Sequence, residues 1–212
     1  MEHGLKEFND ALARHDKPAC VKIAMGLLDT AQPDIVSLYE KVLRPALASI
    51  ASNDKKQEIP VWDEHIRSSI VRSIVELCYP TVIKQASAAT GLKAAIFCTE
   101  DEAHEIGARM VADYLTLAGF DTVFIGASTP TDAILDAIAR LQPDLVAISV
   151  TNYYHLVALS ALVARIRAMT TVKTRIIAGG YAVSTLKNPE SFDVDDFAHG
   201  FDDLVRIREE LL

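Results

Sequence analysis

Apolar residues in roughly the first 90 positions recur every three or four residues, a spacing that predicts helices. The positions that carry this spacing are Leu5, Phe8, Leu12, Cys20, Ile23, Leu27, Ile35, Leu38, Val42, Ile50, Ile66, Ile70, Ile74 and Leu77. Pro18 fits the first turn of a helix, and Pro80 should end or kink the last one. We expect four or five short antiparallel helices that pack as a bundle.

After Gly91 the pattern changes to short apolar runs that alternate with helical segments. The runs predict strands at 93–98, 121–125, 145–149 and 174–178, with a weaker fifth near 195–198. Helices are expected near 103–118, 131–141, 154–169 and 201–211. Strands and helices that alternate in this way form a parallel α/β sheet wound on both faces. We therefore expect a helical bundle over residues 1–88 and an α/β domain over 89–212.

Composition and charge narrow the class of protein. Half of the 212 residues are apolar and 24% are charged, as in a folded protein. Residues 1–90 carry 11 basic and 12 acidic side chains, a net of −1, whereas residues 91–212 carry 10 and 17, a net of −7. Neither part has a basic stripe, so we expect no direct nucleic-acid ligand and no polybasic membrane patch.

Targeting and cysteine signals are weak along the whole chain. No apolar run approaches the ~18 residues of a membrane helix, and the first residues lack the apolar core of a signal peptide. We therefore expect a cytoplasmic protein without a membrane segment. Cys20, Cys78 and Cys98 are too few and too scattered for a disulfide framework or a Cys-x-x-Cys metal site.

The loop after the first predicted strand carries metal-capable chemistry. Ligands of parallel α/β sheets lie beyond the carboxyl ends of the strands, where this loop places Glu102 and His104. The carboxylate could hold one ring nitrogen and leave the other as a metal ligand. Gly107 costs a helix about 1 kcal/mol relative to alanine, which is understandable if a large group approaches the backbone there. A surface histidine among acidic neighbours is the alternative.

Small residues follow the third and fourth predicted strands. Ser149 and Thr151 lie at the exit of the third strand, and Gly179 and Gly180 close the fourth. A flat group could lie beside the sheet where side chains are this small. A Gly-Gly pair alone is weak evidence for a site, since many turns between strands and helices contain one.

Taken together, these residues resemble the cobalamin-binding domain of the corrinoid protein family. The family pattern is Asp-x-His-x-x-Gly, then Ser-x-Leu or Ser-x-Thr, then Gly-Gly. It stands here as Glu102-x-His104-x-x-Gly107, Ser149-Val150-Thr151 and Gly179-Gly180. The resemblance covers nearly all of 91–212. It implies a flavodoxin-like (Rossmann-like) five-stranded parallel sheet, preceded by an all-α helical bundle cap.

The resemblance also implies roles for these residues. His104 would displace the benzimidazole of the cofactor and become the lower ligand to cobalt. The displaced tail would lie in a slot beside Ser149, Thr151, Gly179 and Gly180. The implied cofactor is cobalamin, in its adenosyl or methyl form.

Two positions depart from the family pattern. Glu102 replaces the aspartate and is one methylene longer, so its hydrogen bond to His104 could shift. In methionine-synthase-like members, a serine six residues after the slot serine continues the hydrogen-bond relay. That position is His155 here, which either pairs with Glu102 or is an ordinary histidine at a helix start.

The bundle resembles the cap of cobalamin-dependent light sensors through Leu38-Tyr39 and the pair Glu64-His65. The tryptophan that stands ten positions before this pair in the sensors is Asp54 here. Trp62, the only tryptophan, either covers the corrin or is a core or half-buried aromatic. Likewise, Glu64 and His65 are either upper-face groups or ordinary residues of a helix start.

These features predict a sensory or regulatory cobalamin protein that acts through a partner protein. Its state would change when the upper ligand is lost, by light or by chemistry. The alternative is a corrinoid subunit that carries methyl groups between methyltransferases, with no catalytic activity alone. A stretch typical of methyl carriers near the end of the cap is missing, which favours the sensor. A third hypothesis is a flavodoxin-like domain without cobalamin. The oligomeric state is open.

Overall fold

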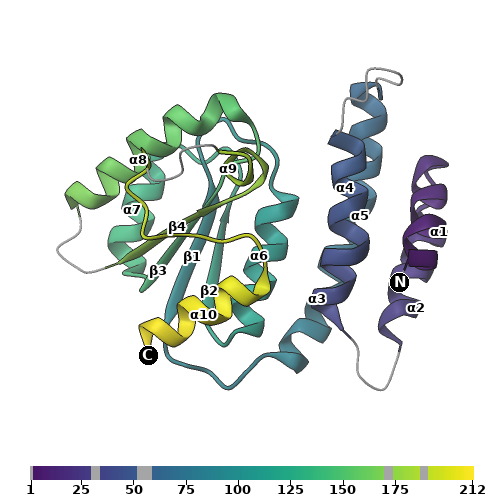
Figure 1. The fold of residues 1–212 in the computed structure, drawn as a ribbon, viewed down its shortest axis with the longest axis horizontal. Helices are drawn as coiled ribbons and strands as arrows, with labels where there is room; N and C mark the ends of the chain where they lie inside the picture. The colour runs from purple at the N-terminus through teal and green to yellow at the C-terminus, as the bar shows by residue number, and fades with distance from the viewer. Residues whose placement is uncertain (1, 30–33, 52–58, 170–173, 187–190) are drawn as a thin grey trace. The chain divides into compact units, whose positions relative to one another are not determined.

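The computed structural model describes residues 2–29, 34–51, 59–169, 174–186 and 191–212. The chain divides into two compact units, Met1–Lys84 and Gln85–Leu212 (Figure 1). The sequence pattern places this division after residue 88. The first unit is helical and the second contains a sheet, so each is described by itself.

The described residues of the helical unit form four helical stretches. These are α1 (Glu2–Ala13), α2 (Lys17–Leu28), the continuous run α3 (Ile35–Leu38), η1 (Tyr39–Leu43) and α4 (Arg44–Ala51), and finally the long α5 (Val61–Gln85). The Asp16 and Asp34 side chains cap α2 and α3 by accepting the N–H of Ala19 and Ser37. Asp54 and most of the polar stretch before α5 lie outside the described residues.

Two prolines, Pro45 and Pro80, lie within continuous helical runs. η1 is a π-helical turn in which the Arg44 N–H bonds to the Tyr39 carbonyl, five residues back. Pro45, which follows, has no N–H and would crowd the carbonyl of Lys41, and the wide turn relieves that crowding. α5 continues past Pro80 to Gln85, so this proline does not end the helix. An exposed stretch around it lets water satisfy the carbonyl that loses its partner.

The second unit is an α/β domain with a five-stranded parallel sheet, so the expected fold class is confirmed. Its strands are β1 (Lys93–Cys98), β2 (Asp121–Gly126), β3 (Leu145–Ser149), β4 (Arg175–Gly179) and β5 (Asp196–Phe197), in the order β2-β1-β3-β4-β5. Its helices are α6 (Ile106–Leu117), α7 (Thr131–Leu141), η2 (Tyr153–His155), α8 (Leu156–Met169), α9 (Tyr181–Ser184) and α10 (Phe201–Leu211).

Helices cover both faces of this sheet (Figure 1). α7, α8 and α9 pack on one face around a cluster that includes Ile134, Leu159, Leu162 and Ile176. On the other face α6 and α10 contact each other, and the rings of Tyr114 and Phe201 lie 5.6 Å apart. None of the helices in the described ranges combines the length and the apolar character needed to cross a membrane.

The strand order places the carboxyl ends of β1 and β3 side by side. The chain leaves β1 toward β2 on one side and returns to β3 on the other, so β1 and β3 are neighbours. Cys98 at the end of β1 is paired with Ser149 at the end of β3. The helix expected from residue 103 begins only at Ile106. The residues between β1 and α6 form a loop in which Asp101 has a φ of 66°.

Candidate cofactor-binding site

The Glu102 side chain is fully buried where the loops after β1 and β3 meet. Its Oε1 accepts two hydrogen bonds from His104, one from the backbone N–H at 3.1 Å and one from ring Nδ1 at 2.6 Å. Its Oε2 accepts the backbone N–H groups of Thr151 at 3.0 Å and Asn152 at 2.8 Å. Ring Nδ1 of His155 lies 3.1 Å from the same oxygen. One carboxylate thus joins two loops and two histidines.

The hydrogen bonds fix the charge of this carboxylate. Burial raises the pKa of Glu102, but the hydrogen bonds from His104, Asn152 and His155 outweigh burial and hold the pKa well below its usual range. An ionised carboxylate can only accept, so Nδ1 of both His104 and His155 carries the hydrogen. In a neutral His104 ring, Nε2 is then the nitrogen with the lone pair. That is the tautomer that a metal ligand needs.

The surroundings of His104 suit a large ligand on one side. Its side chain is 54% exposed, whereas that of His155 is 20% exposed. At Gly107, in the first turn of α6, an added Cβ would meet no described atom within 4 Å. The structure therefore offers an anchored, accessible imidazole beside open backbone.

Backbone crowding alone explains why Gly179 and Gly180 are glycines. An added Cβ at Gly179 would lie 2.8 Å from the carbonyl oxygen of Ala198. Gly180 has a φ of 101°, and a Cβ there would clash with the carbonyl oxygen of Val150. The two glycines let neighbouring strand exits approach each other, so their presence alone is not evidence of a ligand slot.

Cys98 lies close to the candidate metal ligand but stays a thiol. Burial and the nearby Glu102 and Glu105 carboxylates raise the pKa of Cys98 to about 12. The thiol is 3.8 Å from the carbonyl oxygen of His104 and is also hydrogen-bonded with Ser149. A protonated thiol is a poor metal ligand, which leaves the imidazole as the stronger donor here.

Asn152 is a site residue that lies at the exit of the third strand but outside the family pattern. Its backbone N–H binds Glu102, while its side chain accepts the N–H of Tyr154 and caps η2. An asparagine directly before a helical segment is a typical N-cap, and this signal could have revealed the turn. The contact with Glu102, however, spans 50 residues of sequence.

Trp62, Glu64 and His65 lie in the first turns of α5, in the helical unit. Trp62 is 62% exposed, so it is not a core aromatic. Its ring lies nearly perpendicular to that of His15, with the two ring centroids 5.9 Å apart. Asp63, which lies between Trp62 and Glu64 in the sequence, is buried and binds His15 and Arg67. The hydrogen bond from Arg67 holds the pKa of Asp63 below its usual value despite burial.

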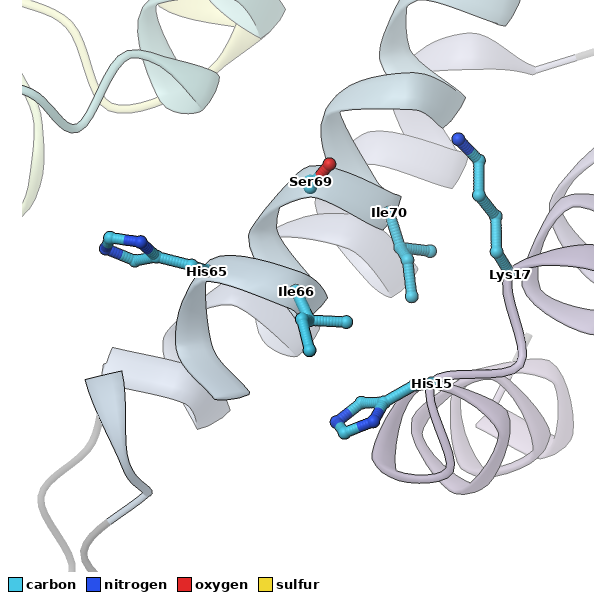
Figure 2. Close-up of a pocket in the computed structure, with 6 residues that line it drawn as sticks. All are labelled: His15, Lys17, His65, Ile66, Ser69 and Ile70. Carbon is cyan, nitrogen blue, oxygen red and sulfur yellow. The ribbon is translucent and has the colours of Figure 1, made fainter. Parts of the chain in front are cut away.

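A hollow of about 390 Å³ lies next to these residues (Figure 2). It is lined by His15, Lys17, His65, Ile66, Ser69 and Ile70. Of the three cap residues singled out in the sequence, only His65 lines it, and Figure 2 shows the ring of His65 directed away from His15 and Lys17. The structure thus brings Trp62, Glu64 and His65 to one end of α5 and joins Trp62 to the turn before α2.

Comparison with known proteins gives a family for this arrangement. Residues 92–208, more than half of the chain, match the family described as the B12 binding domain. The HTH-type transcriptional repressor CarA of Myxococcus xanthus is 27% identical over 125 residues, 58% of this chain and 41% of the relative. The trimethylamine corrinoid protein of Methanosarcina barkeri is 26% identical over 149 residues, 70% of this chain and 65% of the relative.

The chain therefore spans 41% and 65% of the lengths of these two relatives. Among solved structures, the monomethylamine corrinoid protein of Methanosarcina barkeri superposes with a TM-score of 0.84 at 19% identity, over 99% of both chains. This likeness shows a shared fold.

The residues at the sheet edge fit a corrinoid. The accessible imidazole of His104 is anchored through Nδ1, and the backbone at Gly107 is open to a large group. A single neutral imidazole nitrogen is a suitable ligand for a transition metal such as cobalt. The chain belongs to the B12 binding domain family, and cobalamin is its cofactor.

Proposed function

We propose that His104 is the lower ligand to cobalt and that Glu102 fixes its ring. The observation that carries this proposal is the 2.6 Å hydrogen bond between the buried Glu102 carboxylate and Nδ1 of the half-exposed His104 ring. Glu102 keeps Nδ1 protonated and directs the opposite nitrogen outward. When bound, cobalamin supplies a cobalt centre that can carry and give up an organic group.

The proposal extends to the residues around His104. Gly107 would leave room for the corrin beside α6, since an added Cβ there meets open space. Ser149, Thr151, Gly179 and Gly180 would border the displaced tail, as in the family pattern. For the last two, backbone crowding is already a sufficient reason for glycine, so their role toward the tail rests on the resemblance alone.

We infer that the chain acts as a corrinoid carrier for a methyl group, which partner methyltransferases load and unload. Two likenesses support this role. The trimethylamine corrinoid protein aligns over 70% of this chain, and the fold of the monomethylamine corrinoid protein extends over 99% of it, helical unit included. Carrier proteins leave the bond-making chemistry to the cofactor and the partner enzymes, which agrees with a site whose side chains only bind and orient.

A cobalamin-dependent regulator is the second candidate. The likeness to the repressor CarA and the pair Glu64-His65 at the start of α5 favour it. In this role, Trp62, Glu64 and His65 would face the upper side of adenosylcobalamin, and loss of the upper group, by light or by chemistry, would change how a partner protein binds.

The ligand proposal is tested by spectroscopy on the loaded protein. Hydroxocobalamin is bound, reduced to cobalt(II), and examined by electron paramagnetic resonance with histidine labelled by nitrogen-15. We expect the labelled nitrogen to split the cobalt signal in the wild type and in His199→Ala, which removes an imidazole from the same unit, but not in His104→Ala. A splitting from nitrogen-15 that survives in His104→Ala would refute the assignment, whereas a splitting from the unlabelled nitrogen of the cofactor would not.

The two roles are separated by which cobalamin form is retained and what it does. A carrier should retain hydroxo- and methylcobalamin and release the methyl group only when methyltransferases are added. A regulator should retain adenosylcobalamin and change its oligomeric state on illumination. Protein that retains no corrinoid after desalting would refute both.

A further inference from the structure

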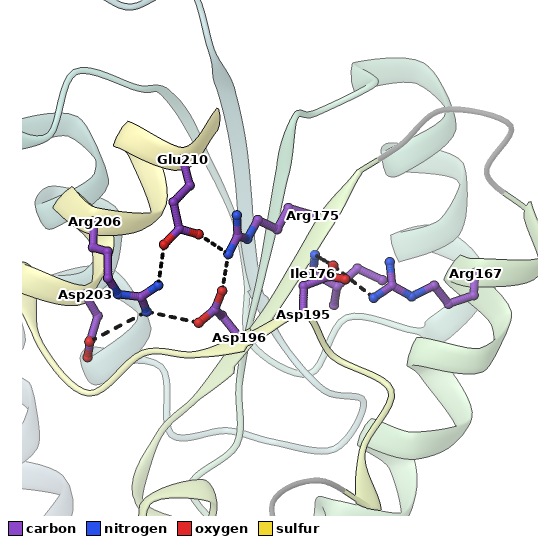
Figure 3. A network of polar contacts seen from close by, with 8 residues as sticks. All are labelled: Arg167, Arg175, Ile176, Asp195, Asp196, Asp203, Arg206 and Glu210. Atoms are coloured by element: carbon purple, nitrogen blue, oxygen red, sulfur yellow. Dashed lines mark hydrogen bonds and ion pairs between the residues drawn. The ribbon is translucent and has the colours of Figure 1, made fainter. Parts of the chain in front are cut away.

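Four charged side chains form a closed ring at the edge of the sheet (Figure 3). Arg175, at the start of β4, binds Asp196 in β5 and Glu210 in α10, the latter at 2.5 Å. Arg206, also in α10, binds Asp196 at 3.0 Å and Glu210 at 2.9 Å. Each arginine thus contacts both acids, and each acid contacts both arginines. The ring ties one helix and two strands together.

The backbone alone holds this edge of the sheet weakly. β5 has two residues, Asp196 and Phe197, which pair with Ile177 and Ala178 of β4. A strand this short at an edge contributes few ladder hydrogen bonds. Several charge-assisted hydrogen bonds in one ring therefore add to the burial of Leu204 and Ile207 in fastening the segment from β5 to α10.

This segment lies against two parts of the proposed cofactor site. The carbonyl oxygen of Ala198, directly after β5, lies 2.8 Å from the position of a Cβ on Gly179. At the start of α10, Phe201 packs on Tyr114 of α6, the helix that follows His104. A displacement of β5 and α10 would consequently move one border of the predicted tail slot and loosen the support of α6.

We propose that the ring of Arg175, Asp196, Arg206 and Glu210 holds the β5–α10 segment in place and thereby sets how fast cobalamin leaves the protein. The inference rests on the proposed function. The four side chains are positioning residues that act through Ala198 and α6. Their side chains are 18% to 46% exposed, so salt reaches and screens them.

The test compares wild type, Arg206→Gln and Arg140→Gln, each loaded with labelled hydroxocobalamin and chased with an excess of unlabelled cofactor. Arg140 forms an exposed pair with Asp136 on α7 at 2.9 Å and serves as the matched control. We expect Arg206→Gln to release cofactor roughly five to ten times faster at low salt. High salt (about 0.5 M) should speed release from the wild type and change the variant less. Arg140→Gln should match the wild type.

Two further measurements keep the outcomes distinct. The absorption spectrum of loaded Arg206→Gln should equal that of the wild type, because the cobalt ligand is unchanged. In the protein without cofactor, hydrogen exchange over residues 201–211 should be faster in Arg206→Gln. Faster exchange combined with an unchanged release rate would overturn the inference and leave the proposed function intact. A wild type that retains no corrinoid would overturn the proposed function, and this inference with it.

Discussion

Ring Nδ1 of His104 lies 2.6 Å from Oε1 of Glu102, although Glu102 is one methylene longer than the aspartate of the family pattern. The longer side chain reaches further into the sheet edge, and its second oxygen accepts the N–H groups of Thr151 and Asn152. The same carboxylate therefore orients the imidazole and joins the exits of β1 and β3. Whether the longer side chain keeps its contact with His104 was open from the sequence, and the structure shows that it does.

The charge of Glu102 should make the α/β unit sensitive to acid. Glu102→Gln should cost about 2–4 kcal/mol in free energy of unfolding at pH 5, because an amide N–H₂ would face hydrogen-bond donors. Folding lowers the pKa of Glu102. The contribution of this carboxylate to the free energy of unfolding is therefore complete above the ordinary carboxyl pKa range, and it is lost as the pH falls below that range.

Urea unfolding between pH 5 and pH 3, across and below the ordinary carboxyl range (pKa about 4.3), measures this. The difference between wild type and Glu102→Gln should shrink steadily toward pH 3. A difference that stays constant across this range would show that the carboxylate is not charged in the folded protein.

His155 should matter less for cobalamin than Glu102, because it acts only through the carboxylate. We expect Glu102→Ala to weaken hydroxocobalamin binding about 10- to 100-fold, as is usual for residues that orient a metal ligand. His155→Ala leaves the N–H groups of Thr151 and Asn152 on Oε2, so its effect should be clearly smaller. Absorption titration measures both affinities. Equal losses for the two variants would mean that His155 itself contacts the cofactor.

Two glycines should respond to alanine in opposite directions. Gly180→Ala should destabilise the protein without cofactor by at least about 2 kcal/mol, because of its φ of 101° and the clash with Val150. Gly107→Ala should raise stability by up to about 1 kcal/mol, since its Cβ meets open space in a helix. If a corrin approaches α6 there, the same Gly107→Ala should bind hydroxocobalamin more weakly. Thermal unfolding measures the stability and absorption titration measures the affinity for hydroxocobalamin. Tighter binding by Gly107→Ala would argue against a corrin close to α6 at this position.

Asp63 should be important for the helical unit. It is buried and joins the turn before α2, through His15, to α5, through Arg67. Asp63→Asn should lower the free energy of unfolding by about 2–3 kcal/mol. Asp136→Asn, which removes an exposed pair with Arg140, should change it by less than about 0.5 kcal/mol. Similar effects of the two substitutions would mean that the buried network adds no more than a surface pair.

Most of the secondary structure could be predicted from the chain, because buried strands and amphipathic helices carry local patterns. The strands 93–98 and 145–149 and the helices 131–141 and 201–211 are confirmed at both ends. The start of α6 was predicted three residues too early, since Glu102 takes up the His104 N–H before the helix begins. The short α9 was not predicted, because four residues carry too little periodicity to stand out.

The sequence by itself determined the two-part layout, the α/β class and the loop that carries His104, since each depends on residues close together in the chain. It also placed the family motif at three strand ends. Only the tertiary structure decided that Glu102 binds the β3 exit and His155, some 50 residues away, and that Gly179 and Gly180 are crowded by Ala198 and Val150. Those contacts depend on the order of strands in the sheet, which no local pattern of apolar and polar residues encodes.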